Sequence, residues 1–253
     1  LSGHTANNRL PIFSSKPAPI QISWLGYFAS TGVAEIDYIL GDPFATPHED
    51  KSHFTEKIWQ LPETYLCFTK PNLKVDVGPL PARASNYITF GCFNKIARIT
   101  DNVISAWSKI LQAVPASKLF LKDKSFSKNS IKEIVYKRFS SFGISKDRLI
   151  LEGKSPREQY LKAYNRVDIA LSPFPYGSVT TSAEGLWMGV PVIIMKGDHF
   201  NSRLGESIAH NTYLSDWIAS NEDDYVSKAI KFTNKIDDLI KLRSSLREQV
   251  VSS

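Results

Sequence analysis

The stretch Val167–Met195, VDIALSPFPYGSVTTSAEGLWMGVPVIIM, contains one complete strand–helix–strand unit. Its two ends, VDIAL and PVIIM, are short apolar runs that predict buried β-strands. The segment from Thr180 to Gly189 lies between them and predicts a helix that ends at the glycine. A strand, a helix and a strand connected this closely predict a right-handed crossover between parallel neighbours.

The same alternation begins at Tyr87. It predicts further strands at 87–93, 118–122 and 148–152 and helices at 101–115, 128–143 and 155–166. Ser155 is expected to cap the last of these helices and Pro156 to be its first residue. Beyond Met195 the sequence predicts only helical segments, at 202–211, 214–220, 221–235 and 235–251. The pattern therefore predicts an α/β fold with a doubly wound parallel sheet.

The residues before Tyr87 have a different pattern. Two strands are expected at 19–26 and 36–42, with a loop between them and a short helix at 50–62. Residues 69–86 are rich in proline, glycine and polar residues and predict a linker. We expect two domains, with 1–86 forming the partial end of a second α/β unit plus linker, and 87–253 forming the doubly wound unit. A strand end, a loop and a short helix are expected within 1–13.

Charge and cysteine content exclude several classes of protein. The net charge is +6, but the basic residues are scattered, which is not typical of a nucleic-acid-binding surface. No apolar run is long enough to span a membrane, so no membrane partner is expected. Cys67 and Cys92 are expected to be buried thiols in a reducing compartment, which favours a cytoplasmic protein.

In such a sheet, ligands are expected to bind beyond the carboxyl ends of the strands. The loops after three predicted strands carry cations, namely Lys95 and Arg98, then Lys154 with Ser155, then Lys196 with His199. Hydroxyl residues Thr180, Thr181 and Ser182 begin the helix after VDIAL, and the free amides of a helix start favour bound anions. Glu184, about one turn further on, could accept hydrogen bonds from a sugar or ribose. The alternative is that Thr180 only caps the helix.

Several common motifs are absent. The sequence contains no glycine-rich dinucleotide fingerprint, no P-loop and no nucleophile elbow. It has no His/Cys cluster at metal-ligand spacing, so no metal site and no cofactor are expected.

Five segments, taken together and in order, resemble a known family. They are APIQISWLGY (18–27), ITFGCFN (88–94), SPFPYGSVTTSAEGLWMGVPV (172–192), GESIAHN (205–211) and LSDWIASNEDDYV (214–226). They are similar to the catalytic region of the O-linked N-acetylglucosamine transferases, including SPINDLY-like members. The resemblance implies a GT-B glycosyltransferase with two Rossmann-like lobes. Residues 1–86 would be the end of the acceptor-side lobe plus the linker, and 87–253 would be the nucleotide-sugar-binding lobe. It also implies tetratricopeptide repeats upstream in the full-length chain.

The resemblance further implies roles for individual residues. Lys95 and Arg98 would contact the donor diphosphate, and Lys154, Ser155 and Tyr160 the base. The helix start Val179–Thr180–Thr181 would hold the phosphates and Glu184 the ribose. The loop 28–32 departs from the family pattern at the donor sugar, and Val179 stands where a side-chain donor is usual.

The implied activity is transfer of N-acetylglucosamine from UDP-GlcNAc to serine or threonine of a protein or peptide, with inversion and without a metal. Three alternatives stay open: a catalytically inactive nucleotide-sugar-binding or scaffold module, another donor such as GDP-fucose, and an asparagine or small-molecule acceptor.

Overall fold

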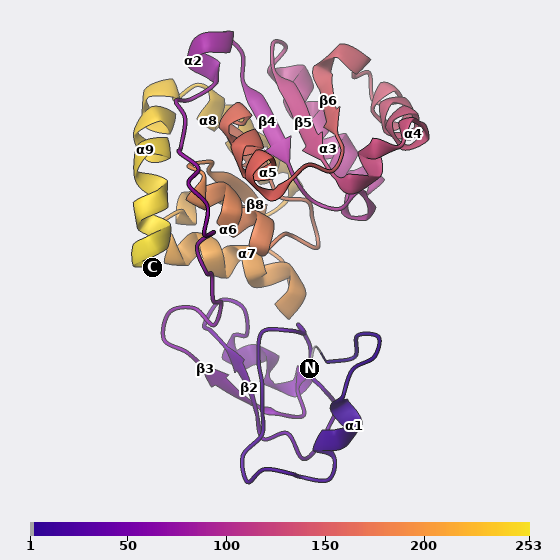
Figure 1. Cartoon of the computed structure of the whole chain (residues 1–253), viewed down its shortest axis with the longest axis vertical. Helices are drawn as coiled ribbons and strands as arrows, with labels where there is room; N and C mark the ends of the chain where they lie inside the picture. The colour runs from indigo at the N-terminus through magenta and orange to yellow at the C-terminus, as the bar shows by residue number, and fades with distance from the viewer. Residues whose placement is uncertain (1–2) are drawn as a thin grey trace.

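The computed structural model describes residues 3–253 and contains two parallel β-sheets joined by a linker (Figure 1). The large sheet has six strands in the order β6-β5-β4-β7-β8-β9, and every pair is parallel. Its strands are β4 (Thr89–Cys92), β5 (Lys118–Lys122), β6 (Leu149–Glu152), β7 (Ile169–Leu171), β8 (Val192–Met195) and β9 (Ile218–Ala219). The chain therefore winds outward from β4 in both directions, as expected for a doubly wound sheet.

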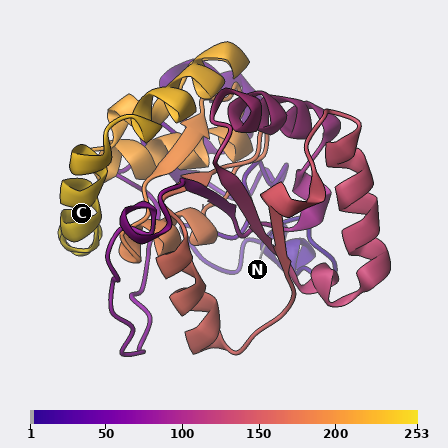
Figure 2. The ribbon, with the colours of Figure 1, turned by 90° about the horizontal axis from the view of Figure 1, so that it is seen from above.

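Helices cover both faces of the large sheet (Figure 2). They are α3 (Asp101–Ala113), α4 (Asn129–Ser140), α5 (Arg157–Ala163), α6 (Thr180–Trp187), α7 (Phe200–Asn211), α8 (Glu222–Thr233) and α9 (Ile236–Ser252). The core on one face includes fully buried Phe90, Val103 and Trp107, and that on the other includes Leu161 and Met188. Burial on both faces explains why the strands of this sheet are continuous apolar runs.

Two expectations for this region are wrong. Residues 214–220 do not form only a helix, because Ile218 and Ala219 pair with β8 and add a sixth strand. The expected start of α5 is also shifted by one residue, because the helix begins at Arg157 and Pro156, rather than Ser155, takes the capping position. The Ser155 hydroxyl is buried and has no hydrogen-bond partner among the described residues. Asn221 caps α8, since its side chain accepts a hydrogen bond from the Asp224 amide.

The small sheet has the order β1-β2-β3, again all parallel, with β1 (Ile22–Ser23), β2 (Tyr38–Gly41) and β3 (Lys57–Gln60). Two of these strands were expected, but the predicted helix at 50–62 is wrong. A 3-10 helix, η1 (His48–His53), ends there and β3 follows it. A short helix, α1 (Leu10–Phe13), and a loop before it agree with the prediction for 1–13. The described part of this segment, residues 3–13, contains no strand, so the expected strand end is not found there.

After it leaves the small sheet, the linker runs past α6 and beside α9 to α2 (Figure 1). The Gly78 amide donates to Asn165 Oδ1 at 2.9 Å, and the amide of Ala82, the first residue of α2 (Ala82–Ser85), donates to Asp168 Oδ1 at 2.9 Å. The domain boundary between residues 86 and 87 stays a prediction.

Cysteine burial differs from expectation for one of the two residues. Cys92 in β4 is buried, and burial raises the pKa of its thiol to about 11, whereas Cys67 in the linker region is exposed. Among the described residues, no helix combines the length and apolar character needed to cross a bilayer.

Candidate functional site

The candidate site lies where the winding direction of the large sheet reverses. Strand β4 has β5 on one side and β7 on the other, so the loops that follow β4 and β7 separate at their carboxyl ends. Ligands of open α/β sheets bind in the crevice at such a point. The loop after β4 carries Asn94, Lys95 and the 3-10 helix η2 (Ile96–Arg98), and the loop after β7 leads into α6.

A cavity of about 290 Å³ occupies this position. Its walls come from distant parts of the chain: Phe28, Phe93, Asn94, Lys95, Arg98, Gly177, Ser178, Val179, Thr180, Thr181, Asn201 and Leu204. The Arg98 guanidinium donates a hydrogen bond to the carbonyl oxygen of Gly177, which ties the two loops together. The structure therefore brings Lys95, Arg98, Val179, Thr180 and Thr181 together around one space.

The start of α6 is open to this cavity. Val179 precedes the first helical residue, and no side chain caps the helix in the part of the chain that the structure describes. Thr180 is exposed, and the Thr181 hydroxyl donates to Asn94 Oδ1 at 3.1 Å. The uncapped amides carry a partial positive charge, and Lys95 and Arg98 are exposed beside them. This arrangement can bind an anion.

Ser182 does not contribute to the anion-binding surface. Its side chain is 2% exposed, and its hydroxyl lies 2.9 Å from that of Ser178. The expectation that three hydroxyl groups face the ligand is thus wrong for this one, because the helix turns its side chain toward the interior.

Glu184 lies one turn into α6 and is only 4% exposed. Its carboxylate accepts a hydrogen bond from the Arg157 guanidinium, which raises the pKa of that guanidinium. Tyr160 lies one turn after Arg157 in α5, and its ring packs edge-on against Phe93 at 5.6 Å. Burial raises the pKa of Tyr160, so its hydroxyl stays protonated.

A second, larger cavity of about 440 Å³ adjoins the first at Val179 and Thr180. Arg157 and Glu184 line it, together with linker residues that include Leu66 and Phe68. Sequence reasoning missed Arg157, although its place as the cation that opens the helix after the β6 loop could have identified it. Arg157 places a positive charge beside the Glu184 carboxylate on the wall of this second cavity.

The other predicted residues lie further away. Lys154 and Ser155 follow β6, two strands from β4, and line neither cavity. The Lys154 amide lies 3.4 Å from Ser127 Oγ, which holds this loop against the turn after β5. His199 precedes α7 and lines a separate cavity of about 270 Å³ with Asp50 and His53.

The loop 28–32, which departs from the family pattern, is held in place by hydrogen bonds to the Glu56 carboxylate. The Thr31 amide donates to Glu56 Oε1 at 2.7 Å, and the Ser30 hydroxyl donates to Oε2 at 2.8 Å. Burial opposes the charge on Glu56, but these hydrogen bonds outweigh burial and lower the pKa of its carboxyl. The loop is thus fixed with Phe28 at the wall of the first cavity.

Within residues 3–253, no group of three or more His, Cys, Asp and Glu side chains is arranged to hold a metal ion. Positive charge near the cavity comes instead from Lys95, Arg98, Arg157 and the start of α6.

Two parallel α/β sheets, with a cavity at the switch point of the larger one, have the arrangement of a GT-B glycosyltransferase fold. Solved structures agree. A mutant of the Thermobaculum terrenum O-GlcNAc transferase superposes with a TM-score of 0.89 at 31% identity, over 96% of this chain and 46% of that one. TarM superposes with a TM-score of 0.60 at 15% identity, which is a likeness of fold alone.

Sequence comparison is more specific. The model of glycosyl transferase family 41 matches residues 1–73 and 79–253, and the chain belongs to this family. It is 37% identical over its whole length to the probable UDP-N-acetylglucosamine–peptide N-acetylglucosaminyltransferase SPINDLY of Solanum lycopersicum. It is 27% identical, over 98% of its length, to the similarly named SEC protein of Arabidopsis thaliana. The chain spans about a quarter of the length of these relatives, 27% and 26%.

Proposed function

We propose that this chain forms the donor-binding part of a glycosyltransferase that moves N-acetylglucosamine from UDP-GlcNAc to serine or threonine hydroxyls of a protein. The observation that carries the proposal is the shared cavity of Lys95, Arg98 and the uncapped start of α6. Two phosphoryl groups need both positive charge and amide donors, and this cavity offers both. The names of the relatives support the choice of donor and acceptor.

The donor would extend in two directions from the phosphate position. Toward α5, Glu184 and Arg157 would meet the ribose hydroxyls, with Tyr160 and the Lys154–Ser155 loop on the side of the base. Toward the small sheet, Phe28 would border the sugar. The lining residues support the ribose and sugar positions, because Thr180 belongs to both cavities, Arg157 and Glu184 only to the second and Phe28 only to the first. Tyr160, Lys154 and Ser155 line neither cavity, so their assignment to the base rests on the family resemblance.

The reaction would be a single displacement with inversion. The acceptor hydroxyl oxygen forms a bond to the anomeric carbon and releases its proton to solvent water, while the bond from that carbon to the diphosphate oxygen breaks and the diphosphate leaves with the electron pair. Lys95, Arg98 and the amides of α6 would stabilise the charge that develops on the diphosphate. Charge stabilisation by these groups would make a metal ion unnecessary. The full-length protein is expected to be larger, with tetratricopeptide repeats that present the acceptor.

Equilibrium binding tests the donor directly. Titration calorimetry of the chain with UDP, UDP-GlcNAc, GDP and GDP-fucose should show binding of the two uridine ligands and weaker binding of the guanosine ligands. Preferential binding of GDP-fucose would support the alternative donor. Absence of heat with every nucleotide at millimolar concentration would refute a donor-binding role. Transfer of labelled sugar to serine- and threonine-containing peptides by the full-length protein would then separate an active enzyme from an inactive binding module.

A further inference from the structure

One face of α7 docks onto the small sheet. Phe200, Arg203 and Ser207 recur at spacings of three and four residues, which places them on one side of a helix. The Phe200 ring lies among aromatic rings of the N-terminal residues, 6.0 Å from Phe28 and 5.3 Å from Tyr65. The helix belongs to the large sheet, so this stripe joins the two sheets.

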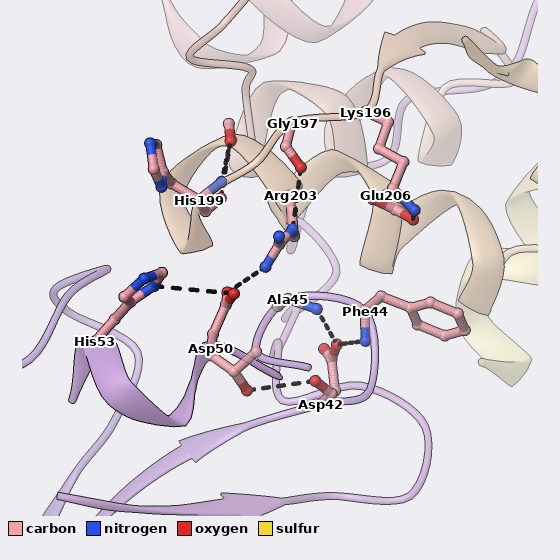
Figure 3. Close-up of polar contacts among 12 residues, drawn as sticks. Asp42, Phe44, Ala45, Asp50, His53, Lys196, Gly197, His199, Arg203 and Glu206 are labelled. Carbon is pink, nitrogen blue, oxygen red and sulfur yellow. Dashed lines mark hydrogen bonds and ion pairs between the residues drawn. The ribbon is translucent and has the colours of Figure 1, made fainter. Parts of the chain in front are cut away.

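The central residue of the stripe, Arg203, forms an ion pair with Asp50. Arg203 donates from Nη1 to Asp50 Oδ2, and the two side chains are only 14% and 10% exposed (Figure 3). Its Nε also donates to the carbonyl oxygen of Gly197 at 3.0 Å, in the loop between β8 and α7. One guanidinium thus holds the small sheet and this loop at once, which the planar fork of arginine allows and lysine does not.

The third contact is a hydroxyl–carboxylate pair. Ser207 Oγ donates to Asp42 Oδ2 at 2.6 Å, directly after β2. Asp42 is fully buried, and the same carboxylate accepts from the amides of Phe44 and Ala45 at 3.0 and 2.7 Å (Figure 3). Both carboxylates that face α7 are therefore buried and paired.

These contacts affect the shape of the first cavity, of about 290 Å³, because α7 also lines it. Asn201 and Leu204 of α7 face the cavity together with Phe28 from the other side of the junction. Phe28 touches Phe200, one turn of helix before Arg203. The distance between Phe28 and the opposite wall of Arg98 and Thr180 is therefore set by how α7 docks.

We infer that Arg203 is a positioning residue, which through Asp50 and Gly197 fixes the Phe28 wall relative to the phosphate-binding wall. The inference rests on the proposed function. A ligand that ends at the diphosphate would touch mainly the wall of the large sheet. A ligand that also carries a sugar would span both walls. Loss of Arg203 should therefore weaken binding of the sugar-bearing ligand selectively.

The test compares UDP with UDP-GlcNAc by calorimetry on the 253-residue chain. Arg203→Met keeps the apolar stem and removes the fork, and Asp50→Asn removes the carboxylate charge with little change of shape. In both variants the affinity for UDP-GlcNAc should fall roughly tenfold, which corresponds to the loss of about one favourable contact to the sugar. The affinity for UDP should change less than about twofold. Arg203→Lys should give the same selective loss. Lys109→Met, which breaks the α3–α8 ion pair with Glu222, is the control and should leave the ratio unchanged.

The ratio of the two affinities separates positioning from simple destabilisation, which would weaken both ligands alike. An unchanged ratio in folded Arg203→Met and Asp50→Asn would overturn the inference. If Arg203→Met fails to fold by circular dichroism, Asp50→Asn and Arg203→Lys decide. Absence of UDP binding by the unsubstituted chain would contradict the proposed function itself and remove the basis of the inference.

Discussion

Removal of the Asp42 carboxylate should cost more stability than most single substitutions in this chain. Asp42 is fully buried and accepts four hydrogen bonds, from the amides of Phe44, Ala45 and Tyr65 and from the Ser207 hydroxyl, at 3.0, 2.7, 3.1 and 2.6 Å. A hydrogen bond to a charged group contributes about 1.5–3 kcal/mol, and each buried donor left without a partner adds a desolvation penalty. Asp42→Ala should therefore lower the free energy of unfolding by about 4 kcal/mol or more, even after some donors find water.

The amide variant separates charge from shape. Asp42→Asn keeps one acceptor for the Phe44 and Ala45 amides but points an NH₂ group at the Tyr65 amide, so we expect a loss of about 2 kcal/mol. Urea unfolding followed by far-ultraviolet circular dichroism measures both values. Asp216→Ala, at an exposed position, should stay within about 0.5 kcal/mol of the parent. A loss below about 1 kcal/mol for Asp42→Ala would refute the view that this carboxylate organises the junction.

Three further predictions concern separate features. Native protein should take up one equivalent of iodoacetamide at pH 8, on exposed Cys67, while buried Cys92 reacts only in denaturant; rapid labelling of both thiols would contradict the structure. Gly189→Ala should lower the free energy of unfolding by about 2 kcal/mol or more, because φ of Gly189 is +74° and an added Cβ would lie 2.7 Å from the Arg243 carbonyl oxygen. A neutral effect in urea unfolding would contradict this prediction and show that the backbone of α9 shifts away from the Cβ at little cost. The lowered pKa of Glu56 means that its ionised form stabilises the fold above the ordinary glutamate pKa of 4.5, and that this contribution is lost as the pH falls through the folded-state value. Glu56→Gln should therefore be less stable than the parent at pH 7, with the difference shrinking toward pH 3 in thermal melts; a constant difference would refute this assignment.

Local pattern predicted the large sheet well for a physical reason. Strands covered on both faces must be apolar throughout, and VIIM in β8 or TFGC in β4 stand out between amphipathic helices. Strand β3, KIWQ, has polar residues at both ends and two adjacent apolar residues between them, so its sequence lacks the alternation of a half-buried strand and was predicted as a short helix. Strand β9 has two residues and exists only because β8 offers a partner.

The candidate site was partly predictable for the same reason. The rule that loops gather at the carboxyl ends of strands placed Lys95, Arg98 and Thr180 near one another from sequence alone. The rule could not find the Arg157–Glu184 pair or the inward turn of Ser182, since both depend on how α5 and α6 pack. Nor could it find α7 as the docking helix, because the carboxylate that pairs with Arg203 lies 153 residues away in the chain.

The most direct test of the account compares UDP with uridine by calorimetry, on the parent chain and on Arg98→Ala. The parent chain should bind UDP at least tenfold more tightly than uridine, because contacts to the diphosphate add about 1.4 kcal/mol or more of binding free energy. Arg98→Ala should lose most of that difference while its affinity for uridine stays the same. An Arg98→Ala chain that keeps the full preference for UDP would show that the diphosphate does not bind between Arg98 and the start of α6.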